Sequence, residues 1–295
     1  MKVIDQYQGK NFALYNGDCV EVAKGLPSES IHYSIFSPPF ESLYTYSNSE
    51  RDMGNCKTDE EFFENFSFLV KELFRITMPG RLVSFHCMDL PMMKQKDGVI
   101  GLKDFPAALR QLFEDEGFIY HSKVTIWKDP VVEMQRTKAL GLLHKQIKKD
   151  SSMCRQGLPD YIATVRKPGE NPERITNNND TFPVNLWQRY ASPVWFDINQ
   201  SNTLQKESAR EEKDEKHICP LQLDTIERCI KLWSNPNDIV FSPFAGIGSE
   251  IYKAIKMGRR GIGIELKESY YKQAVLNCKK AEDEVSQATL FDYME

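Results

Sequence analysis

The tetrapeptide Ser37-Pro38-Pro39-Phe40 follows residues 31–36, whose alternation of side chains predicts a strand. Proline has a fixed φ and no backbone N–H, so the carbonyl groups of this turn are held without neighbouring amide donors. The Pro38 carbonyl and the Ser37 hydroxyl can each accept a hydrogen bond from an NH2 group, and Phe40 offers a flat face to a ring. These residues are therefore a candidate site for a planar molecule that carries an amine. A proline-rich structural turn is the alternative.

A glycine-rich turn lies late in the chain, where residues 238–242 predict a strand that leads into Gly246-x-Gly248 and a helix. Glycines let the backbone approach a ligand closely, and a helix N-terminus offers unpaired N–H groups to a negative charge. Residues 260–265 predict the next strand, and its last residue, Glu265, is placed to bind the two hydroxyls of a ribose. Together these features predict a nucleoside-cofactor site, although Gly-x-Gly alone is also typical of a tight strand–helix turn. The third glycine of the dinucleotide fingerprint and a Gly-Lys-Ser/Thr sequence are missing, so neither NAD nor a nucleoside triphosphate is favoured.

Both motifs are expected at the carboxyl ends of strands in an α/β fold, where such sheets bind ligands. Apolar periodicity predicts strands at 12–15, 31–36, 81–87, 118–127, 238–242 and 260–265. Helices are predicted after the N-cap residue Asp18 and at 58–77, 104–116, 221–233, 249–257 and 268–280. This alternation indicates a mostly parallel sheet with helices on both faces. Residues 168–216 are expected to be irregular, with loops near 168–182 and 201–216.

The composition is that of a globular protein. Hydrophobic residues make up 41% of the 295 positions, enough for a sizeable core, and the length fits one α/β domain with insertions. No apolar stretch approaches the roughly 18 residues of a membrane span, and the N-terminus lacks a secretory signal, so we expect a cytoplasmic protein with no membrane partner. Seven cysteines without a Cys-x-x-Cys pair argue against a disulfide framework and a structural zinc. His217 and Cys219 alone are too few ligands, so no metal is expected.

The charges are unevenly distributed over a chain whose net charge is −4. Residues 131–170 hold eight basic and four acidic side chains, which indicates either a solvated helix face or a patch that contacts DNA phosphates. The candidate phosphate contacts are Lys145, Lys148, Lys149 and Arg155. Residues 281–295 carry five acids and no Lys or Arg, so this acidic tail is expected to be a solvated face or a mobile end.

The two motifs resemble those of a known enzyme family. The sequences SPPF and FSPFAGIGS, with the strand GIGIEL after the second, look like motifs IV, I and II of the amino-methylating DNA methyltransferases. The tetrapeptide precedes the cofactor turn, an order similar to the circularly permuted β class of N4-cytosine and N6-adenine enzymes. The resemblance implies a Rossmann-like methyltransferase sheet. Residues 1–128 would be its catalytic half, 129–215 an inserted target-recognition region and 216–280 its cofactor-binding half.

The cofactor implied by this resemblance is S-adenosyl-L-methionine. Asp18, after Gly17, resembles the acid that binds the adenine amine, and residues 216–220 resemble the motif that packs round the methionine part. The cofactor-binding residues implied are Asp18, His217, Pro220, Ser242, Phe244, Gly246, Gly248, Ser249 and Glu265. Two of them depart from the family pattern, because Ser242 stands where Asp is usual and Ser249 where Thr is usual. The first departure removes an acid from near the methionine amine.

The implied reaction is a direct in-line transfer of a methyl group to the exocyclic amine of a base flipped out of double-stranded DNA. Ser37, Pro38, Pro39 and Phe40 are then the catalytic motif, and residues 43–56 resemble the loop that folds over the active site. A first-position serine is typical of enzymes that act on N4 of cytosine, aspartate of those that act on adenine, and asparagine of those that methylate protein amides. N4 of cytosine is therefore the expected target. N6 of adenine is the alternative, and a catalytically inactive DNA-binding relative is the second. A homodimer and a cognate restriction nuclease both remain open.

Overall fold

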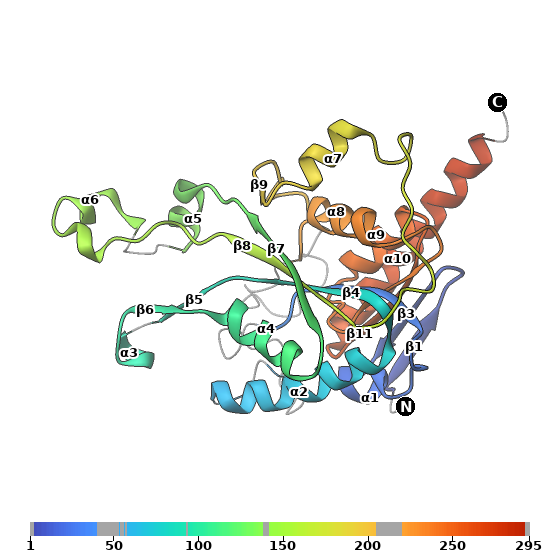
Figure 1. The fold of residues 1–295 in the computed structure, drawn as a ribbon, viewed down its shortest axis with the longest axis horizontal. Helices are drawn as coiled ribbons and strands as arrows, with labels where there is room; N and C mark the ends of the chain where they lie inside the picture. Colours follow the sequence, from blue (N-terminus) through green and yellow to red (C-terminus); the bar gives the residue numbers. More distant parts are fainter. Residues whose placement is uncertain are drawn as a thin grey trace.

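One nine-stranded sheet with helices on both faces forms the body of the protein (Figure 1). The computed structural model describes residues 3–39, 53, 56, 58–92, 94–137, 142–204 and 220–292. The order of the strands within these residues is β1-β2-β11-β10-β3-β4-β8-β7-β9. They are β1 (Asp5–Gln8), β2 (Phe12–Asn16), β3 (Ile31–Phe36), β4 (Thr77–Cys87), β7 (Ile119–Ile126), β8 (Asp160–Arg166), β9 (Val194–Trp195), β10 (Ile239–Ser242) and β11 (Arg260–Glu265). A separate antiparallel pair joins β5 (Leu90–Met92) to β6 (Gly101–Lys103).

The centre of the sheet is parallel. β2, β11, β10, β3 and β4 pair in parallel, whereas β8 runs antiparallel to both β4 and β7. β10 and β11 come late in the chain, yet they lie between β2 and β3, which come early. This order confirms the expected mostly parallel α/β sheet, and it puts the carboxyl ends of strands from both ends of the chain at one edge.

Helices cover the two faces in separate groups (Figure 1). One face carries α1 (Cys19–Ala23), α2 (Asp59–Ile76) and α4 (Phe105–Asp115), and the other carries α8 (Leu223–Trp233), α9 (Ser249–Lys256) and α10 (Glu268–Asp292). The shorter helices are α3 (Lys94–Asp97), α5 (Pro130–Thr137), α6 (His144–Ile147), a 3-10 helix (Ser151–Met153) and α7 (Val184–Tyr190). None of the helices described has an apolar stretch that could cross a bilayer.

Separate hydrophobic clusters hold the two helical layers to the sheet. Phe62 and Phe66 of α2, one helical turn apart, are fully buried in the cluster that lies against one face of β3 and β4. On the other face, Ile226 and Ile230 of α8 pack in a cluster with Tyr33 of β3. β3 is therefore buried on both faces, as expected for a central parallel strand, and not on one face only as its alternation indicated.

Two segments of residues 129–215, the predicted target-recognition region, belong to the sheet. Residues 160–166 form β8, which pairs with β4 on one side and β7 on the other, and residues 194–195 form β9 at the edge. β8 carries a short apolar run beside basic residues, and its pairing with β7 depends on contacts that local periodicity does not report. The connection between β7 and β8, which contains α5 and α6, extends away from the sheet at the left of Figure 1.

The carboxyl-terminal helix is longer than predicted. α10 was expected to end at residue 280, but it continues to Asp292, so the described part of the acidic tail is helical. Ala281 is fully buried and Val285 packs against the same cluster, while Glu284 accepts a hydrogen bond from Lys256 at 2.9 Å. No proline or glycine interrupts this segment. Asp283 is exposed, whereas Glu282 and Glu284 are half-buried and accept hydrogen bonds from Lys10 and Lys256, so acidic as well as apolar side chains anchor this part of the helix.

Candidate active site and cofactor site

The two sequence motifs meet at the same edge of the sheet. β3 and β10 are neighbouring parallel strands, with Phe241 opposite Ser34. Ser37 and Phe244 each come three residues after this pair, so they leave the sheet at the same level. The rings of Phe36 and Phe244 lie edge to face with centroids 5.8 Å apart. The predicted catalytic and cofactor motifs are therefore direct neighbours, although they come from opposite ends of the sequence.

Ser37 is half-buried directly after β3, and the two prolines that follow it are buried. Its hydroxyl oxygen lies 3.1 Å from Nδ1 of His86, the next-to-last residue of β4. Phe40 lies outside the described residues, as does most of the segment 43–56 expected to fold over the site. The described part of the tetrapeptide thus presents one hydroxyl and a run of backbone without N–H donors at the sheet edge.

His86 is itself held by a buried carboxylate. Its Nε2 lies 3.1 Å from Oδ2 of Asp160, the first residue of β8, and Oδ1 of Asp160 lies 2.5 Å from the Lys128 ammonium. Burial alone would raise the pKa of Asp160, but the neighbouring His86 and Lys128 outweigh it and lower the pKa to about 2. Neither His86 nor Asp160 was predicted as a site residue from the sequence. A polar residue at the carboxyl end of a buried strand, as in Phe85-His86-Cys87, was the available signal.

The glycine turn after β10 has the conformation that its sequence requires. Gly246 and Gly248 both have positive φ, 52° and 87°. A Cβ at Gly248 would lie 3.1 Å from the Cβ of Ala274, so this glycine permits the close packing of α10. A Cβ at Gly246 would meet nothing within 4 Å, so the turn is open at that point.

Glu265 ends β11 beside this turn, as predicted. One carboxylate oxygen accepts a hydrogen bond from the Gly246 N–H at 2.8 Å, and the other accepts one from the Lys267 N–H at 2.8 Å. Glu265 pairs with Asn16 at the end of β2, which brings the segment around Asp18 to the same edge. The Asp18 side chain accepts from the Glu21 N–H at 2.9 Å, which confirms its prediction as the N-cap of α1.

The remaining cofactor candidates surround the turn. Ser242 is fully buried, and no described group is within hydrogen-bonding distance of its hydroxyl. Phe244 stacks on Phe66 at 6.1 Å, and Ser249 is buried at the start of α9. Pro220 is half-buried before α8, whereas His217 lies outside the described residues. A buried hydroxyl without a partner, an open glycine turn and a terminal carboxylate fit a polar nucleoside ligand.

Glu250 is a buried acid that the sequence analysis did not single out. It lies in the first turn of α9 and is 4% exposed. Burial raises the pKa of its carboxyl to about 8, and the charge of Glu265 adds to the effect. Glu250 is therefore protonated at neutral pH, and the negative charge beside the glycine turn comes from Glu265.

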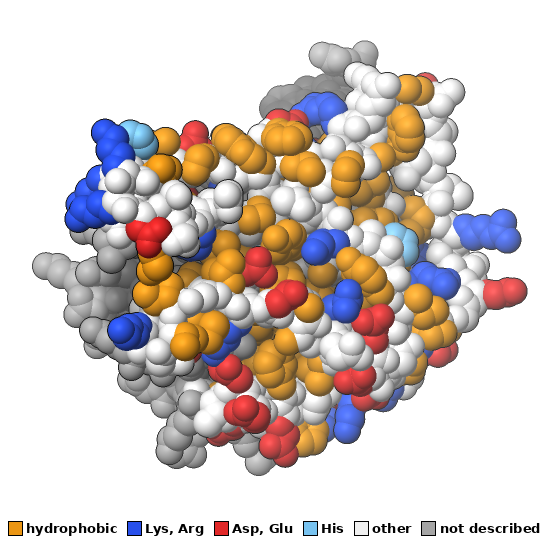
Figure 2. All heavy atoms as spheres, turned by 60° about the vertical axis from the view of Figure 1, so that its left-hand side comes forward, with side chains coloured by type: hydrophobic (Ala, Val, Ile, Leu, Met, Phe, Trp, Pro, Cys, Tyr) orange, Lys and Arg blue, Asp and Glu red, His pale blue; other side chains and the backbone are white. Residues whose placement is uncertain are grey.

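The basic candidates lie on the connection between β7 and β8. Lys145, Lys148 and Lys149 are exposed in and just after α6, and Arg155 is half-buried with a guanidinium N–H directed to the Gln156 carbonyl at 2.9 Å. Figure 2 turns this side of the molecule forward and shows Lys and Arg side chains gathered at its upper left, apart from the acids along the lower part of the same face.

The aromatic residues of the segment 187–196 divide into two pairs. Tyr190 and Trp195 are buried, and the Arg228 guanidinium lies over both rings at 5.1 and 5.2 Å. Trp187 and Phe196 are 53% and 66% exposed. The first pair belongs to the core, and only the second pair is available to a ligand.

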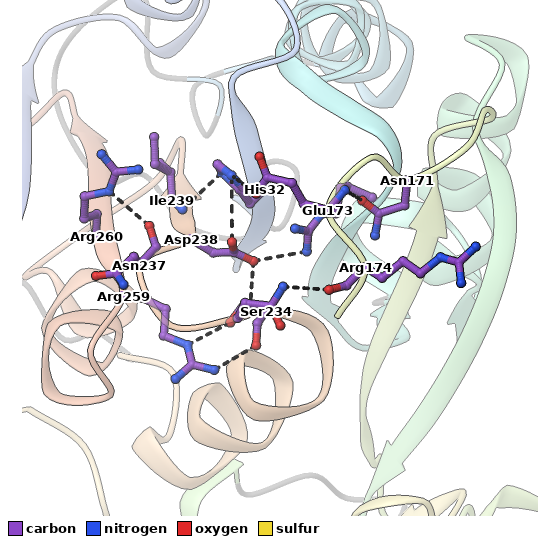
Figure 3. Close-up of polar contacts among 12 residues, drawn as sticks. His32, Asn171, Glu173, Arg174, Ser234, Asn237, Asp238, Ile239, Arg259 and Arg260 are labelled. Atoms are coloured by element: carbon purple, nitrogen blue, oxygen red, sulfur yellow. Dashed lines mark hydrogen bonds and ion pairs between the residues drawn. The ribbon is translucent and has the colours of Figure 1, made fainter. Parts of the chain in front are cut away.

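A polar cluster at the amino-terminal edge of the sheet contains the three potential metal ligands His32, Glu173 and Asp238 (Figure 3). His32 Nδ1 accepts from the Ile239 N–H at 3.2 Å, so the neutral ring carries its proton on Nε2. That N–H points to Glu173 at 3.3 Å, and the buried Arg81 neutralises Asp238 at 3.1 Å. A metal would need the Nε2 lone pair, so this geometry favours a hydrogen-bonded clamp that joins β3, β4 and β10.

Known proteins with related sequences were found over nearly the whole chain. A family model described as DNA methylase, of the N6/N4 methyltransferase type, matches residues 31–276. The type II methyltransferase M1.MboII of Moraxella bovis is 24% identical over 277 residues, which cover 90% of this chain and 96% of the relative. The type II methyltransferase M.ScaI of Streptomyces caespitosus is 23% identical over 274 residues, which cover 91% of this chain and 82% of the relative.

Solved structures share the fold. PvuII DNA methyltransferase (cytosine-N4-specific) is 17% identical with a TM-score of 0.65, covering 96% of this chain and 94% of its own. TTHA0409 of Thermus thermophilus, solved with S-adenosyl-L-methionine, is 21% identical with a TM-score of 0.65, covering 91% of this chain and 95% of its own. With the family model matched over most of the sequence, the chain belongs to the N6/N4 family of DNA methylases, S-adenosyl-L-methionine-dependent enzymes that methylate amino groups of DNA bases.

Proposed function

We propose that this protein methylates N4 of cytosine in double-stranded DNA, acting on a base that is flipped out of the helix. The observation that carries the proposal is the Ser37 hydroxyl, which lies at the sheet edge beside the glycine turn and precedes two buried prolines. A neutral hydroxyl at this position accepts a hydrogen bond from the amine without adding a charge. The likeness of the fold to a methyltransferase described as cytosine-N4-specific supports the same target.

The chain's own part in the reaction is to bind and orient the amine. The lone pair of an exocyclic amine is delocalised into the ring, so the nitrogen is a poor nucleophile. Hydrogen bonds from its N–H groups to Ser37 Oγ and the Pro38 carbonyl would turn the nitrogen toward tetrahedral geometry and hold it in one place. When bound, S-adenosyl-L-methionine supplies an electrophilic methyl group on its sulfonium. Phe40 would provide the ring face on which the base stacks.

The cofactor would be held at the carboxyl ends of β2, β10 and β11. Glu265 is placed for the ribose hydroxyls, Gly246 and Gly248 for close approach of the backbone, and the unpartnered Ser242 hydroxyl for a polar group of the methionine part. Asp18 would contribute its second carboxylate oxygen to the adenine amine, because the first caps α1. Phe244, Ser249, Pro220 and His217 would complete the contacts.

DNA recognition is proposed for those parts of residues 129–215 that lie outside the sheet. Lys145, Lys148 and Lys149 are exposed there on a segment that extends from the body of the protein, and exposed lysines can neutralise phosphates. Phosphate contacts position a protein on DNA, while contacts to base edges specify the sequence. The names of the relatives, type II methyltransferases, support a role that protects DNA from a partner restriction nuclease.

Mass spectrometry of nucleosides tests the proposal directly. Duplex DNA is incubated with the purified protein and S-adenosyl-L-methionine, digested, and compared with the same reaction of Ser37→Ala. We expect N4-methyldeoxycytidine from the wild type only. N6-methyldeoxyadenosine would move the target to adenine and leave the enzyme class intact. No methylated nucleoside, with cofactor binding preserved, would mean a catalytically inactive DNA-binding relative.

A further inference from the structure

Four polar side chains form a continuous series across neighbouring strands at the active-site edge. Ser37 follows β3 and His86 is near the end of β4, with Oγ and Nδ1 3.1 Å apart. Asp160 begins β8, which runs in the opposite direction, and its Oδ2 lies 3.1 Å from His86 Nε2. Lys128, just after β7, lies 2.5 Å from the other oxygen of Asp160. The strand order β3-β4-β8-β7 therefore delivers one member of the series from each strand.

The series defines which nitrogen of His86 carries the proton. Asp160 is 3% exposed and ionised, because His86 and Lys128 hold the pKa of its carboxyl near 2 against the effect of burial. An ionised carboxylate accepts hydrogen bonds and donates none, so an Asp160 oxygen 3.1 Å from Nε2 favours the tautomer of His86 with its hydrogen on Nε2. In the tautomer with hydrogen on Nε2, the Nδ1 atom is an acceptor and takes the Ser37 hydroxyl hydrogen at an Oγ to Nδ1 distance of 3.1 Å. The lone pairs of Ser37 Oγ are left to accept from another donor.

A purely structural role explains this arrangement less well. The backbone ladders already pair β3 with β4 and β4 with β8. Burying a carboxylate, an ammonium and an imidazole costs desolvation free energy, and apolar residues of similar size would often serve stability as well or better. The buried groups converge on the one hydroxyl that the proposed reaction needs.

We propose that His86, held by Asp160, is a positioning residue that fixes the Ser37 hydroxyl as an acceptor for the target amine. Through Ser37 it also takes up the proton that the amine releases. This inference rests on the proposed function, because it requires methyl transfer at Ser37. It adds a route for the proton, which a serine hydroxyl alone does not provide.

The amine nitrogen forms a bond to the methyl carbon as the bond from that carbon to sulfur breaks, and the nitrogen becomes positively charged. One N–H bond then breaks as its proton moves to Ser37 Oγ, and the original hydroxyl proton moves to His86 Nδ1. The products are a neutral methylated amine, a thioether and an imidazolium that faces the Asp160 carboxylate. The imidazolium afterwards releases its proton to water.

The test is the single-turnover rate of methyl transfer, measured from about pH 5.5 to about pH 9. His86→Asn keeps an amide oxygen near the position of Nδ1 but takes up no proton. We expect the rate of this variant to fall by about 10²-fold, the scale of lost general acid–base catalysis, while cofactor binding stays unchanged. In the wild type the rate should fall at low pH, because a protonated ring donates to Ser37 instead of accepting from it. This fall in rate at low pH should be absent from His86→Asn.

His121→Asn is the matched control. The ring of His121 also has a serine hydroxyl 2.9 Å from Nδ1, that of Ser122, but it is exposed on β7 and away from Ser37. The methyl-transfer rate of His121→Asn and its pH profile should match those of the wild type. A second readout, nitrogen-15 NMR of the wild-type histidines, should report the His86 hydrogen on Nε2, and it serves even if His86→Asn does not fold.

Three results would overturn the inference alone: a wild-type rate in His86→Asn, a fall in rate at low pH that survives in that variant, or a His86 hydrogen on Nδ1. A wild-type protein that produces no methylated nucleoside would instead overturn the proposed function, and the inference with it. Measuring the wild type first therefore separates the two failures.

Discussion

The carboxylate of Glu265 accepts a hydrogen bond from the backbone N–H of Gly246 at 2.8 Å, so the end of β11 holds the turn that follows β10. Its other oxygen accepts from the Lys267 N–H. Glu265 thus orders the glycine turn through one oxygen and the start of the next segment through the other. A ligand that bound this carboxylate would share it with the Gly246 and Lys267 N–H groups, so Glu265 would couple cofactor binding to the shape of the turn.

Glu265→Ala is expected to weaken the binding of S-adenosyl-L-methionine by at least about tenfold, the scale of one lost charged hydrogen-bond pair. Glu265→Gln keeps an oxygen for the Gly246 N–H but loses the charge, so it should preserve Tm better than Glu265→Ala. Isothermal calorimetry gives Kd for each variant. Glu268→Ala, an exposed acid in the first turn of α10, should bind like the wild type. An unchanged Kd in Glu265→Ala would show that this carboxylate only orders the turn.

Ser37→Ala and Phe40→Ala are expected to abolish or greatly reduce methylation while Kd for the cofactor stays within a few-fold. Both residues are assigned to the base, and Ser37 is hydrogen-bonded to His86 rather than to the glycine turn. Methyl transfer to DNA and calorimetry on the same preparations separate the two properties. Ser67→Ala is the control, at a serine of α2 whose hydroxyl donates to the Glu64 carbonyl of its own helix. Loss of cofactor binding in step with activity would contradict the assignment.

Glu250→Gln is expected to stabilise the protein at alkaline pH. The pKa of Glu250 is about 8 in the folded protein against an ordinary value of 4.5, so between these values the unfolded chain loses a proton that the folded chain keeps. The free energy of unfolding of the wild type therefore falls as pH rises from about 4.5 to about 8, and glutamine removes this loss. The gain in Tm should be small at pH 5 and reach several degrees near pH 8.5, because each kcal/mol of unfolding free energy shifts Tm by about 2 to 4 °C.

Glu60→Gln, at an exposed position on α2, controls for the change in net charge. Its Tm should follow the wild type over the same pH range. A Tm difference between Glu250→Gln and the wild type that stays constant from pH 5 to pH 8.5 would mean that Glu250 is ionised in the folded state.

Local sequence predicted the parts of the fold whose boundaries have local causes. β3 and β11 begin and end where their periodicity placed them, and Thr58 caps α2 by accepting from the Glu61 N–H at 3.2 Å. β8 was missed because a short strand amid basic residues is defined by its two neighbours. The end of α10 was placed too early because the helix beyond residue 280 is anchored by contacts such as that of Glu284 with Lys256 of α9, which no local pattern shows.

The candidate site likewise has residues that local sequence predicts and residues that it does not. Ser37 and the glycine turn are recognisable from residue type and spacing, because proline and glycine constrain the backbone wherever they occur. The link from Ser37 to His86 and Asp160 cannot be recognised from residue type and spacing, because it requires β4 to lie beside β3 and β8 to lie beside β4. Strand order is a property of the whole chain, so side chains that meet across strands are found only in the assembled sheet.

DNA binding should depend on the three exposed lysines in and after α6. Replacing Lys145, Lys148 and Lys149 with glutamine is expected to weaken affinity for duplex DNA and to flatten its salt dependence. Each phosphate contact releases about one counterion, so the slope of log Kd against log salt should fall by up to about three if all of them touch phosphate. Affinity for the cofactor should not change. The measurement is a binding titration of labelled duplex DNA across a series of salt concentrations.

A second triple variant separates a local contact from a general charge effect. Lys24, Lys272 and Lys280 are 55%, 65% and 72% exposed at their side chains, and each lies within 4 Å of an acid of α1 or α10. Replacing these three with glutamine changes the net charge by the same amount, so any long-range effect of charge should appear equally in both variants. A flatter slope confined to the variant of Lys145, Lys148 and Lys149 supports phosphate contacts on the connection between β7 and β8. Coincident lines for that variant and the wild type would show that these lysines lie on a solvated face, and the DNA contacts would then have to come from other residues.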